Sequence, residues 1–279
     1  GFTAIQTYNY DELNRLKSAE EKIANVTSWK QTFTFDRYGN RRFDENNTDT
    51  LAPSCATAVC NPTIDPATNK LVGYTFDNAG NTEIDANGQT FTYDAENKQI
   101  LVKDSQSNTV GEYWYDGDGK RVKKKVGTDI TIFVYNSSGQ LVAEYSNQIS
   151  QTPKVSYLTN DHLGSPRITT DKDGDIYTRR DFMPFGEEID VNHTSQRTAT
   201  LNYASDEIRQ KFTSYERDNE TDLDYAQARY NNSSIGRFTS PDPLHASANA
   251  GRPQSWNRYL YVENNPINFS DPSGLKTCF

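Results

Sequence analysis

A short motif recurs six times in the first half of the chain and restricts its fold more than any other feature. Each copy has an aromatic residue, any residue, a second aromatic residue and then Asp or Asn, followed after two variable residues by Gly or Asn. Successive Asp/Asn positions are 25, 41, 17, 22 and 20 residues apart, so the long second gap indicates an insertion. The copies are Tyr8–Asp11, Phe33–Asp36, Tyr74–Asp77, Phe91–Asp94, Tyr113–Asp116 and Phe133–Asn136.

Each copy is typical of a β-hairpin. Two aromatic residues at i and i+2 of a strand point to the same face. The Asp accepts backbone hydrogen bonds at the start of a turn, and Gly supplies the positive φ that reverses the chain. One hairpin cannot bury its aromatic row alone, so stacked copies are expected to form an array. We therefore expect equivalent strand positions, on one side of a single sheet, for Tyr10, Phe35, Phe76, Tyr93, Tyr115 and Tyr135.

The composition also favours a mainly β protein. The 279 residues include 17 Tyr and 13 Phe but a single Met, and turn-forming residues occur along the whole length. Mean hydropathy is low at −0.87. The 12% aromatic content nevertheless argues against disorder, because disordered chains are poor in aromatic residues.

Charge and hydropathy exclude several classes of partner. The net charge of −9 disfavours nucleic-acid binding, which needs concentrated Lys and Arg. The one basic cluster, Lys120–Lys125, is interpreted as the solvent-exposed face of a strand. No run of eighteen apolar residues occurs, so no membrane span is predicted, and no cofactor motif was identified. The chain starts at Gly1 without Met or a signal-like segment, which suggests a piece of a longer polypeptide.

The insertion, at about 45–70, contains two of the three cysteines. Cys55 and Cys60 could close a small disulfide, which would place the protein outside the cytosol. Zinc is a weaker alternative, because no second pair of ligands follows and the three His lie far apart. Cys278 has no evident partner in the sequence.

Two other patterns have simple structural explanations. The Asp-rich segments Asp116–Gly119 and Asp171–Asp175 suggest calcium, but an EF-hand requires Glu at the twelfth position, where Gly127 and Phe182 stand. We interpret both segments as turns, and no metal site is predicted. His162 has no nearby nucleophile pattern, so a structural hydrogen bond is expected for it.

The last 120 residues contain a specific series of motifs. The motifs are Asp161–Arg167, Met183–Glu187, Lys211–Asp218, Leu223–Tyr230, Gly236–Pro243, Asn264–Pro266 and Asp271–Leu275. Their order resembles the C-terminal core-associated domain of Rhs (rearrangement hotspot) and YD-repeat proteins, including Tc toxin C-component shells.

The resemblance implies an architecture and a function. Residues 1–190 would form a β-sheet wall that curves around a hollow interior, and 191–275 an irregular plug that spirals inward. Composition favours short helical turns within 206–228 of that plug. Members of the family enclose a C-terminal toxin and release it by cleavage of the chain, so residues 276–279 would lie beyond the cleavage site. A bacterial protein, secreted or on the cell surface, is implied.

The resemblance also implies a site for self-cleavage. Asp242 and Asp271 match the two family carboxylates that are proposed to act as an aspartyl dyad, and the cleaved bond would join Leu275 to Lys276. Two carboxylates in close contact cannot both ionise comfortably, so the pair can hold one proton and activate a water. Arg237 is available to orient one carboxylate through a bidentate contact.

Alternatives remain open at this stage. An Asp-Pro pair commonly starts a turn, as expected for Asp65-Pro66, so the two late pairs could be structural. Expected partners are the N-terminal remainder of the wall, a C-terminal toxin domain and other copies paired through sheet edges. A cell-surface structural or adhesive protein without cargo is one alternative function, and an active processing peptidase is another.

Overall fold

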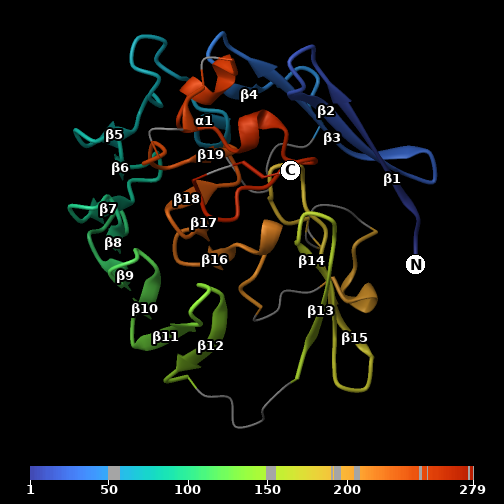
Figure 1. The fold of residues 1–279 in the computed structure, drawn as a ribbon. Coiled ribbons are helices and arrows are strands. Elements are labelled where there is room, and N and C mark those ends of the chain that lie inside the picture. Colours follow the sequence, from blue (N-terminus) through green and yellow to red (C-terminus); the bar gives the residue numbers. More distant parts are fainter. Residues whose placement is uncertain are drawn as a thin grey trace.

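The computed structural model describes residues 1–49, 57–148, 155–189, 191, 196–203, 208–244, 247–249, 251–275 and 277–278. Its regular elements are nearly all antiparallel β-strands, which confirms the predicted mainly β class. Figure 1 shows three sheets arranged around a fourth at the centre. We call β1 to β15 the wall, and the described residues from 208 onward the plug.

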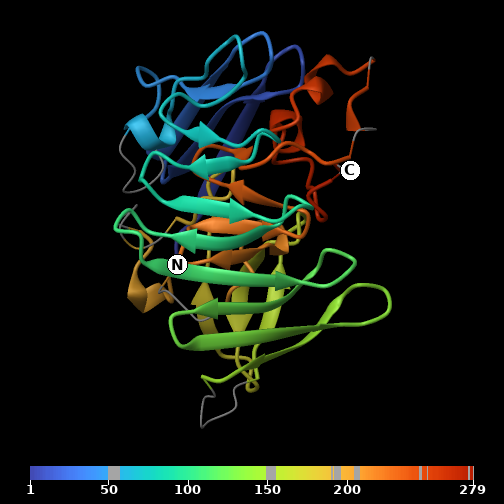
Figure 2. The same cartoon turned by 90° about the vertical axis from the view of Figure 1, so that its left-hand side faces the viewer.

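Each of the three sheets of the wall is a meander, in which every strand pairs with the next along the chain, as hairpin repeats require. The first sheet contains β1 (Ala4–Tyr10), β2 (Leu16–Ile23), β3 (Val26–Phe35) and β4 (Arg41–Phe43), and the short helix α1 (Thr57–Cys60) follows it. Figure 2 shows the strands of the eight-stranded sheet side by side: β5 (Thr75–Phe76), β6 (Thr82–Ile84), β7 (Thr90–Tyr93), β8 (Gln99–Lys103), β9 (Thr109–Tyr115), β10 (Arg121–Val126), β11 (Asp129–Tyr135) and β12 (Leu141–Ser146). The third sheet contains β13 (Tyr157–Asn160), β14 (Pro166–Thr170) and β15 (Ile176–Arg179).

The plug is more regular than predicted. Its sheet contains β16 (Glu216–Asp218), β17 (Leu223–Ala226), β18 (Arg229–Asn232) and β19 (Arg237–Phe238). Within the described part of 206–228, Phe212–Ser214 forms one helical turn, as expected, and the segment also contains β16 and β17. All four residues of β17 are buried, and packing on both faces overrides helix propensity.

The repeat hypothesis is confirmed at the level of the hairpin. The second aromatic residue of every copy is the last residue of its strand, and the residue between the two aromatics is exposed in all six copies. The prediction of a single sheet was wrong. Tyr10 and Phe35 belong to the first sheet, whereas the other four second aromatics belong to the eight-stranded sheet. The insertion after β4 separates these two groups.

The turns follow the predicted chemistry. At Asp36, Oδ1 accepts hydrogen bonds from the backbone N–H groups of Tyr38 (2.8 Å) and Asn40 (2.9 Å). Gly39 then has φ +80°, a value that few other residues adopt. The same pattern recurs at Asp116. Local sequence therefore determines where each hairpin reverses.

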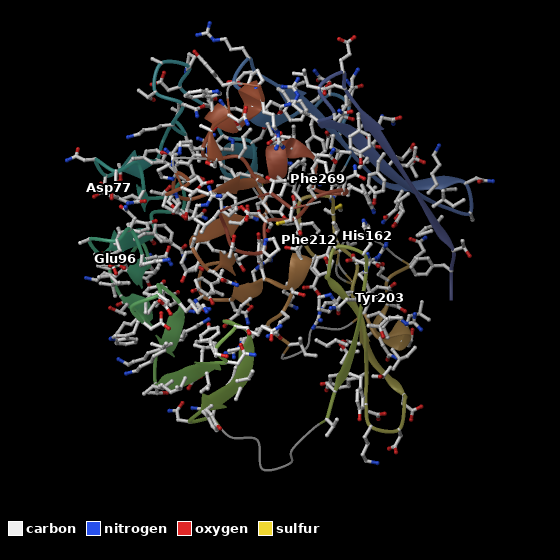
Figure 3. All side chains as sticks on the ribbon, viewed as in Figure 1. Asp77, Glu96, His162, Tyr203, Phe212 and Phe269 are labelled. Atoms are coloured by element: carbon white, nitrogen blue, oxygen red, sulfur yellow. The ribbon has the colours of Figure 1, made fainter. Side chains whose placement is uncertain are left out.

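The wall and the plug share two apolar cores. One lies against the first sheet and includes Trp29, Phe33, Phe212 and Tyr261. Figure 3 shows Phe212 at the centre of the molecule, whereas Asp77 and Glu96 lie at the outer rim of the wall. The other core combines wall and plug residues Phe91, Val102, Tyr113, Leu223, Tyr225 and Tyr230. The inward aromatics of the repeats therefore pack on the plug rather than line an empty space.

Tyr113 and Tyr115 provide a stability test of the repeat. Tyr113 is 2% exposed, whereas Tyr115 is only half-buried, and its hydroxyl donates to the carbonyl of Gln99. Tyr113→Ala is expected to lower the free energy of unfolding by about 3–5 kcal/mol, the usual range for a buried aromatic residue. Tyr115→Ala should cost less, and urea unfolding of both variants measures the difference. A larger loss at Tyr115 would mean that the second aromatic is the core residue.

Charged side chains are also buried between the wall and the plug. Arg121 and Lys124 on β10 point inward, where both contact Asp218 on β16. Arg121 is fully buried and Lys124 is 6% exposed. The interpretation of Lys120–Lys125 as a solvent-exposed face was therefore wrong for these two residues, because acidic plug residues lie opposite them.

Two further observations concern the chain as a whole. None of the helices in the described ranges is long and apolar enough to cross a membrane. Cys60 is buried and disulfide-bonded. Cys55 lies outside the described residues, so the Cys55–Cys60 pair stays a prediction.

Candidate functional site

The two predicted carboxylates each begin a tight turn. Asp242 follows β19, and its Oδ1 accepts a hydrogen bond from the N–H of Leu244 at 2.8 Å. Asp271 lies near the end of the chain, and its Oδ1 accepts from the N–H of Leu275 at 3.0 Å. One oxygen of each carboxylate therefore stabilises its own turn, as Asp commonly does in an Asp-Pro segment. The second oxygen of each points elsewhere.

The Oδ2 atoms of both carboxylates lie near Arg229, the first residue of β18. Its Nη2 lies 3.6 Å from Oδ2 of Asp242 and 3.2 Å from Oδ2 of Asp271. All three side chains are more than nine-tenths buried. The two oxygens can be no farther apart than the sum of these two distances, so both carboxylates lie around one guanidinium nitrogen. The fold thus brings together two residues that are 29 positions apart in the sequence.

Arg229 is held in place by three further contacts. Its Nη1 donates to the carbonyl of Arg258 at 2.9 Å, and its Nε donates to the carbonyl of Gly274. The guanidinium carbon lies 3.6 Å from the centre of the Phe238 ring. Burial lowers the pKa of Arg229 below its ordinary value, while Asp242 and Asp271 oppose that effect. A fixed cation of this kind holds both carboxylates close.

Arg237 does not occupy the predicted position. Its Nη1 donates to Oδ1 of Asn40 at 2.7 Å, its Nη2 donates to the carbonyl of Asn69, and its guanidinium stacks on Tyr259. Neighbouring residues of a strand point to opposite faces. Because Phe238 packs beneath Arg229, Arg237 points away from the carboxylates. The predicted contact from Arg237 is therefore corrected to one from Arg229.

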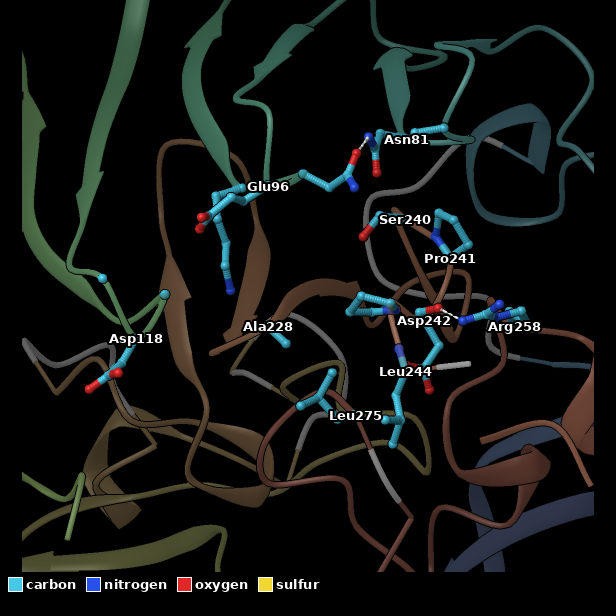
Figure 4. Close-up of a pocket in the computed structure, with 16 residues that line it drawn as sticks. Asn81, Glu96, Asp118, Ala228, Ser240, Pro241, Asp242, Leu244, Arg258 and Leu275 are labelled. Carbon is cyan, nitrogen blue, oxygen red and sulfur yellow. Dashed lines mark hydrogen bonds between the residues drawn. The ribbon is translucent and has the colours of Figure 1, made fainter. Parts of the chain in front are cut away.

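Two clefts reach the site. The larger, of about 620 Å³, lies between the repeat turns of the wall and the segment around Asp242. The smaller, of about 350 Å³, contains both carboxylates and Arg229. Leu275 borders both clefts, and Figure 4 shows it between Ala228 and Leu244. The last residue before the predicted cleavage site therefore lies beside the carboxylates, whereas Lys276 lies outside the described residues.

Other sequence candidates have structural roles. Nε2 of His162 lies 2.8 Å from the carbonyl oxygen of Ile267, so the expected structural hydrogen bond is confirmed. Asp171 accepts backbone hydrogen bonds in a turn of the repeat type. Over the ranges that the structure covers, no group of three or more His, Cys, Asp or Glu could hold a metal ion.

Glu187 of the upstream motif is buried near Arg41, which donates hydrogen bonds to the segment that leads to the site. It is 4% exposed and lies near Arg41, whose guanidinium is surrounded by Phe33, Phe43 and Phe185. Arg41 donates hydrogen bonds to the carbonyl oxygens of Ser234 and Ile235, which lie just before β19. Burial raises the pKa of Glu187 to about 7, although Arg41 acts to lower it.

The pKa of Glu187 predicts a pH dependence of stability. A folded-state pKa above the ordinary 4.5 gives a stabilising contribution that is full below pH 4.5 and is lost as the pH rises through about 7. Glu187→Gln is expected to stabilise the protein at pH 8 by about 1–3 kcal/mol, because the amide stays neutral. Urea unfolding at pH 5 and 8 measures this. Glu188→Gln is the control and should destabilise at pH 8, since Glu188 pairs with Lys211.

This architecture defines a class of protein: a β-sheet wall closed by a plug whose last turn lies beside paired carboxylates. No protein-family model matches the chain. It is 27% identical over 285 residues to the tRNA3(Ser)-specific nuclease WapA of Bacillus spizizenii, which covers 95% of this chain. It is 23% identical over 316 residues to toxin subunit YenC1 of Yersinia entomophaga, which covers 99%. The crystal structure of TcdB2-TccC3 covers 97% with a TM-score of 0.68 at 21% identity.

These comparisons agree with the resemblance that the sequence motifs suggested. The chain is similar to part of the WapA nuclease and to part of toxin subunit YenC1, and it shares its fold with part of the TcdB2-TccC3 structure. It spans 12% of the length of the WapA relative, 29% of YenC1 and 16% of the TcdB2-TccC3 chain. The module is thus a small part of each of these proteins.

Proposed function

We propose that this chain is the C-terminal end of an Rhs/YD-repeat shell that holds a C-terminal toxin domain and releases it by self-cleavage after Leu275. The observation that carries the proposal is the placement of Asp242 and Asp271 on one guanidinium, with Leu275 bonded to the second of them. A pair of structural turns would not require two buried carboxylates to share a cation. Removing three charged groups from water costs free energy, so such a cluster is expected only where the charges are paired or take part in a function.

The proposed chemistry is hydrolysis of one peptide bond, once per chain. A water attacks the carbonyl carbon of Leu275, and the bond to the nitrogen of Lys276 breaks. We assign Asp242 as the base that accepts the proton of the water, because it borders both clefts. Asp271 is assigned as the acid, which starts protonated and gives its proton to the leaving amine. Arg229 stabilises the single negative charge of the pair, which lies on Asp242 before the two proton transfers and on Asp271 after them.

The remaining wall would come from the preceding part of the protein. β1 is the end strand of the first sheet, and a further hairpin could pair with its outer edge. The same backbone hydrogen bonding between edge strands would join successive repeats into a longer wall. Secretion or a cell-surface location accords with the names of the relatives as toxin subunits and nucleases.

The test is the mass of the full-length protein after purification. Self-cleavage predicts one fragment that ends at Leu275 and a second that begins at Lys276, both from a single purified chain. Cleavage should follow first-order kinetics independent of protein concentration, because the site and the bond belong to one chain. An intact chain after prolonged incubation, with a folded plug, would contradict the proposal.

A cell-surface structural or adhesive role is the second candidate. It is favoured by two strands that end their sheets with exposed aromatic side chains: Tyr145 on β12 is 64% exposed, and Tyr157 on β13 is 58% exposed. Such edges can pair with a strand from another chain. In this case the full-length protein should remain intact and associate with itself, which sedimentation would detect.

A further inference from the structure

The turn that precedes the proposed cleavage site lies against the tip of the β17–β18 hairpin. The N–H of Ala228 donates to the carbonyl of Ser273 at 3.1 Å, and Nε of Arg229 donates to the carbonyl of Gly274. Within the turn, the N–H of Gly274 donates to the carbonyl of Asp271 at 3.1 Å. Two consecutive backbone carbonyls are thus held by two consecutive residues of the hairpin.

The approach between the two segments is close enough to require glycine. Gly274 has φ +67°, and a Cβ atom added there would lie 2.4 Å from the carbonyl oxygen of Ala226 and 3.2 Å from the nitrogen of Arg229. Neither atom can move easily, because Ala226 is fully buried and pairs with Arg229 in the sheet. Both the backbone conformation and the space therefore exclude a side chain.

The rest of the turn is anchored at both ends. The hydroxyl of Tyr215, a residue 3% exposed, donates to the carbonyl of Asp271. At the other end, the N–H of Leu275 donates to Asp271 Oδ1, and Figure 4 shows the Leu275 side chain between Ala228 and Leu244. The five residues before the proposed bond are thus held mainly through backbone atoms.

We infer that the tip of the β17–β18 hairpin is a substrate subsite, which binds the backbone of the two residues before Leu275. This contact makes Gly274 the residue that determines cleavage specificity. The inference rests on the proposed function, because it identifies the substrate of that same site. The hairpin binds the backbone carbonyls of Ser273 and Gly274 within this turn and accepts no side chain at Gly274. It thereby fixes which bond faces Asp242 and Asp271.

The inference is tested by substitutions at 274 in the full-length protein. Gly274→Ala should slow cleavage at least about 100-fold, because a displacement of about 1 Å from the reacting geometry has that effect. Gly274→Asn separates the two constraints, since Asn tolerates a positive φ but still carries Cβ. It should be as slow as the Ala variant. Gly174→Ala is the matched control and should cleave at the normal rate, because Gly174 also has a positive φ of +88° but no atom lies within 4 Å of the added Cβ, in a turn outside the site.

The position of cleavage provides a readout that a loss of stability would not change. With the subsite disturbed, residual product from Gly274→Ala should include chains that end at residues other than Leu275, whereas the Gly174→Ala product should end only at Leu275. Cleavage of Gly274→Ala or Gly274→Asn at the normal rate and position would overturn the subsite while leaving the proposed function intact.

A second measurement tests the subsite if the normal chain does not cleave, an outcome that contradicts only the proposed function. Hydrogen exchange at the amides of Ala228 and Leu275 should be slow in the normal protein, because both donate hydrogen bonds within this contact. Exchange should be at least about tenfold faster in Gly274→Ala. Equal exchange in the two proteins would show that the hairpin does not bind the turn.

Discussion

Replacing Asp242 by Asn is expected to slow release of the segment after Leu275 by about 10²–10⁴-fold, the usual contribution of a general base. Asn has nearly the same volume, and its side-chain oxygen can still accept the hydrogen bond from Leu244 that forms the turn. The fold should therefore survive while the proton acceptor is lost. A time course of fragment formation in the full-length protein, followed by mass spectrometry, measures the effect.

The matched control is Asp65→Asn. Asp65 is also followed by Pro, and its Oδ1 accepts a hydrogen bond from the N–H of Ala67 at 2.9 Å, in a turn outside the site. This variant should cleave like the normal protein. If Asp242→Asn also cleaves at the normal rate, Asp242 is not catalytic, and the Asp242-Pro243 segment is a structural turn.

Replacing Asp218 by Ala is expected to lower the free energy of unfolding by about 3–5 kcal/mol, because it removes the carboxylate that contacts both buried cations, Arg121 and Lys124. Oδ2 of Asp218 lies 2.5 Å from Nη1 of Arg121, and Oδ1 lies 2.7 Å from Nζ of Lys124. Glu216 contacts Arg121 at 2.9 Å and Glu220 contacts Lys124 at 3.0 Å, so each cation keeps one carboxylate partner but loses the shared one. Urea unfolding at pH 7 measures the loss.

The effect of Asp218 should depend on pH. Burial acts to raise the pKa of Asp218, but Arg121 and Lys124 hold it below its ordinary value. A depressed pKa gives a contribution that is present above the ordinary pKa of the carboxyl and is lost as the pH falls below it. The difference between the normal protein and Asp218→Ala should therefore shrink in acid. The control is Asp173→Ala, where an exposed Asp pairs with Lys172, and it should change stability by less than about 0.5 kcal/mol.

A loss below about 1 kcal/mol for Asp218→Ala would show that water or another carboxylate compensates the cations. It would also mean that the apolar contacts of Tyr113, Tyr225 and Tyr230 hold the plug to the wall. A large loss would identify the buried charges as the main link between β10 and β16.

The sequence alone determined the local structure of the wall. Two aromatics, Asp and Gly at fixed spacing set the face of each strand, the residue at which it ends and the turn that follows, because all of these depend on neighbouring residues. The prediction therefore placed Tyr93 and Tyr115 at strand ends. The motifs also identified Asp242 and Asp271 as a pair, although the local signal of each was only an Asp-Pro turn.

Only the tertiary structure decided which residues meet across elements. The register of β18 and β19 places Arg229, rather than Arg237, between the carboxylates. The burial of Lys124 depends on Asp218, which is 94 residues away. Contacts of this kind follow from sheet pairing and from the packing of the plug into the wall, which no short segment specifies. Local chemistry therefore fixed the hairpins, whereas the arrangement of distant strands fixed the site.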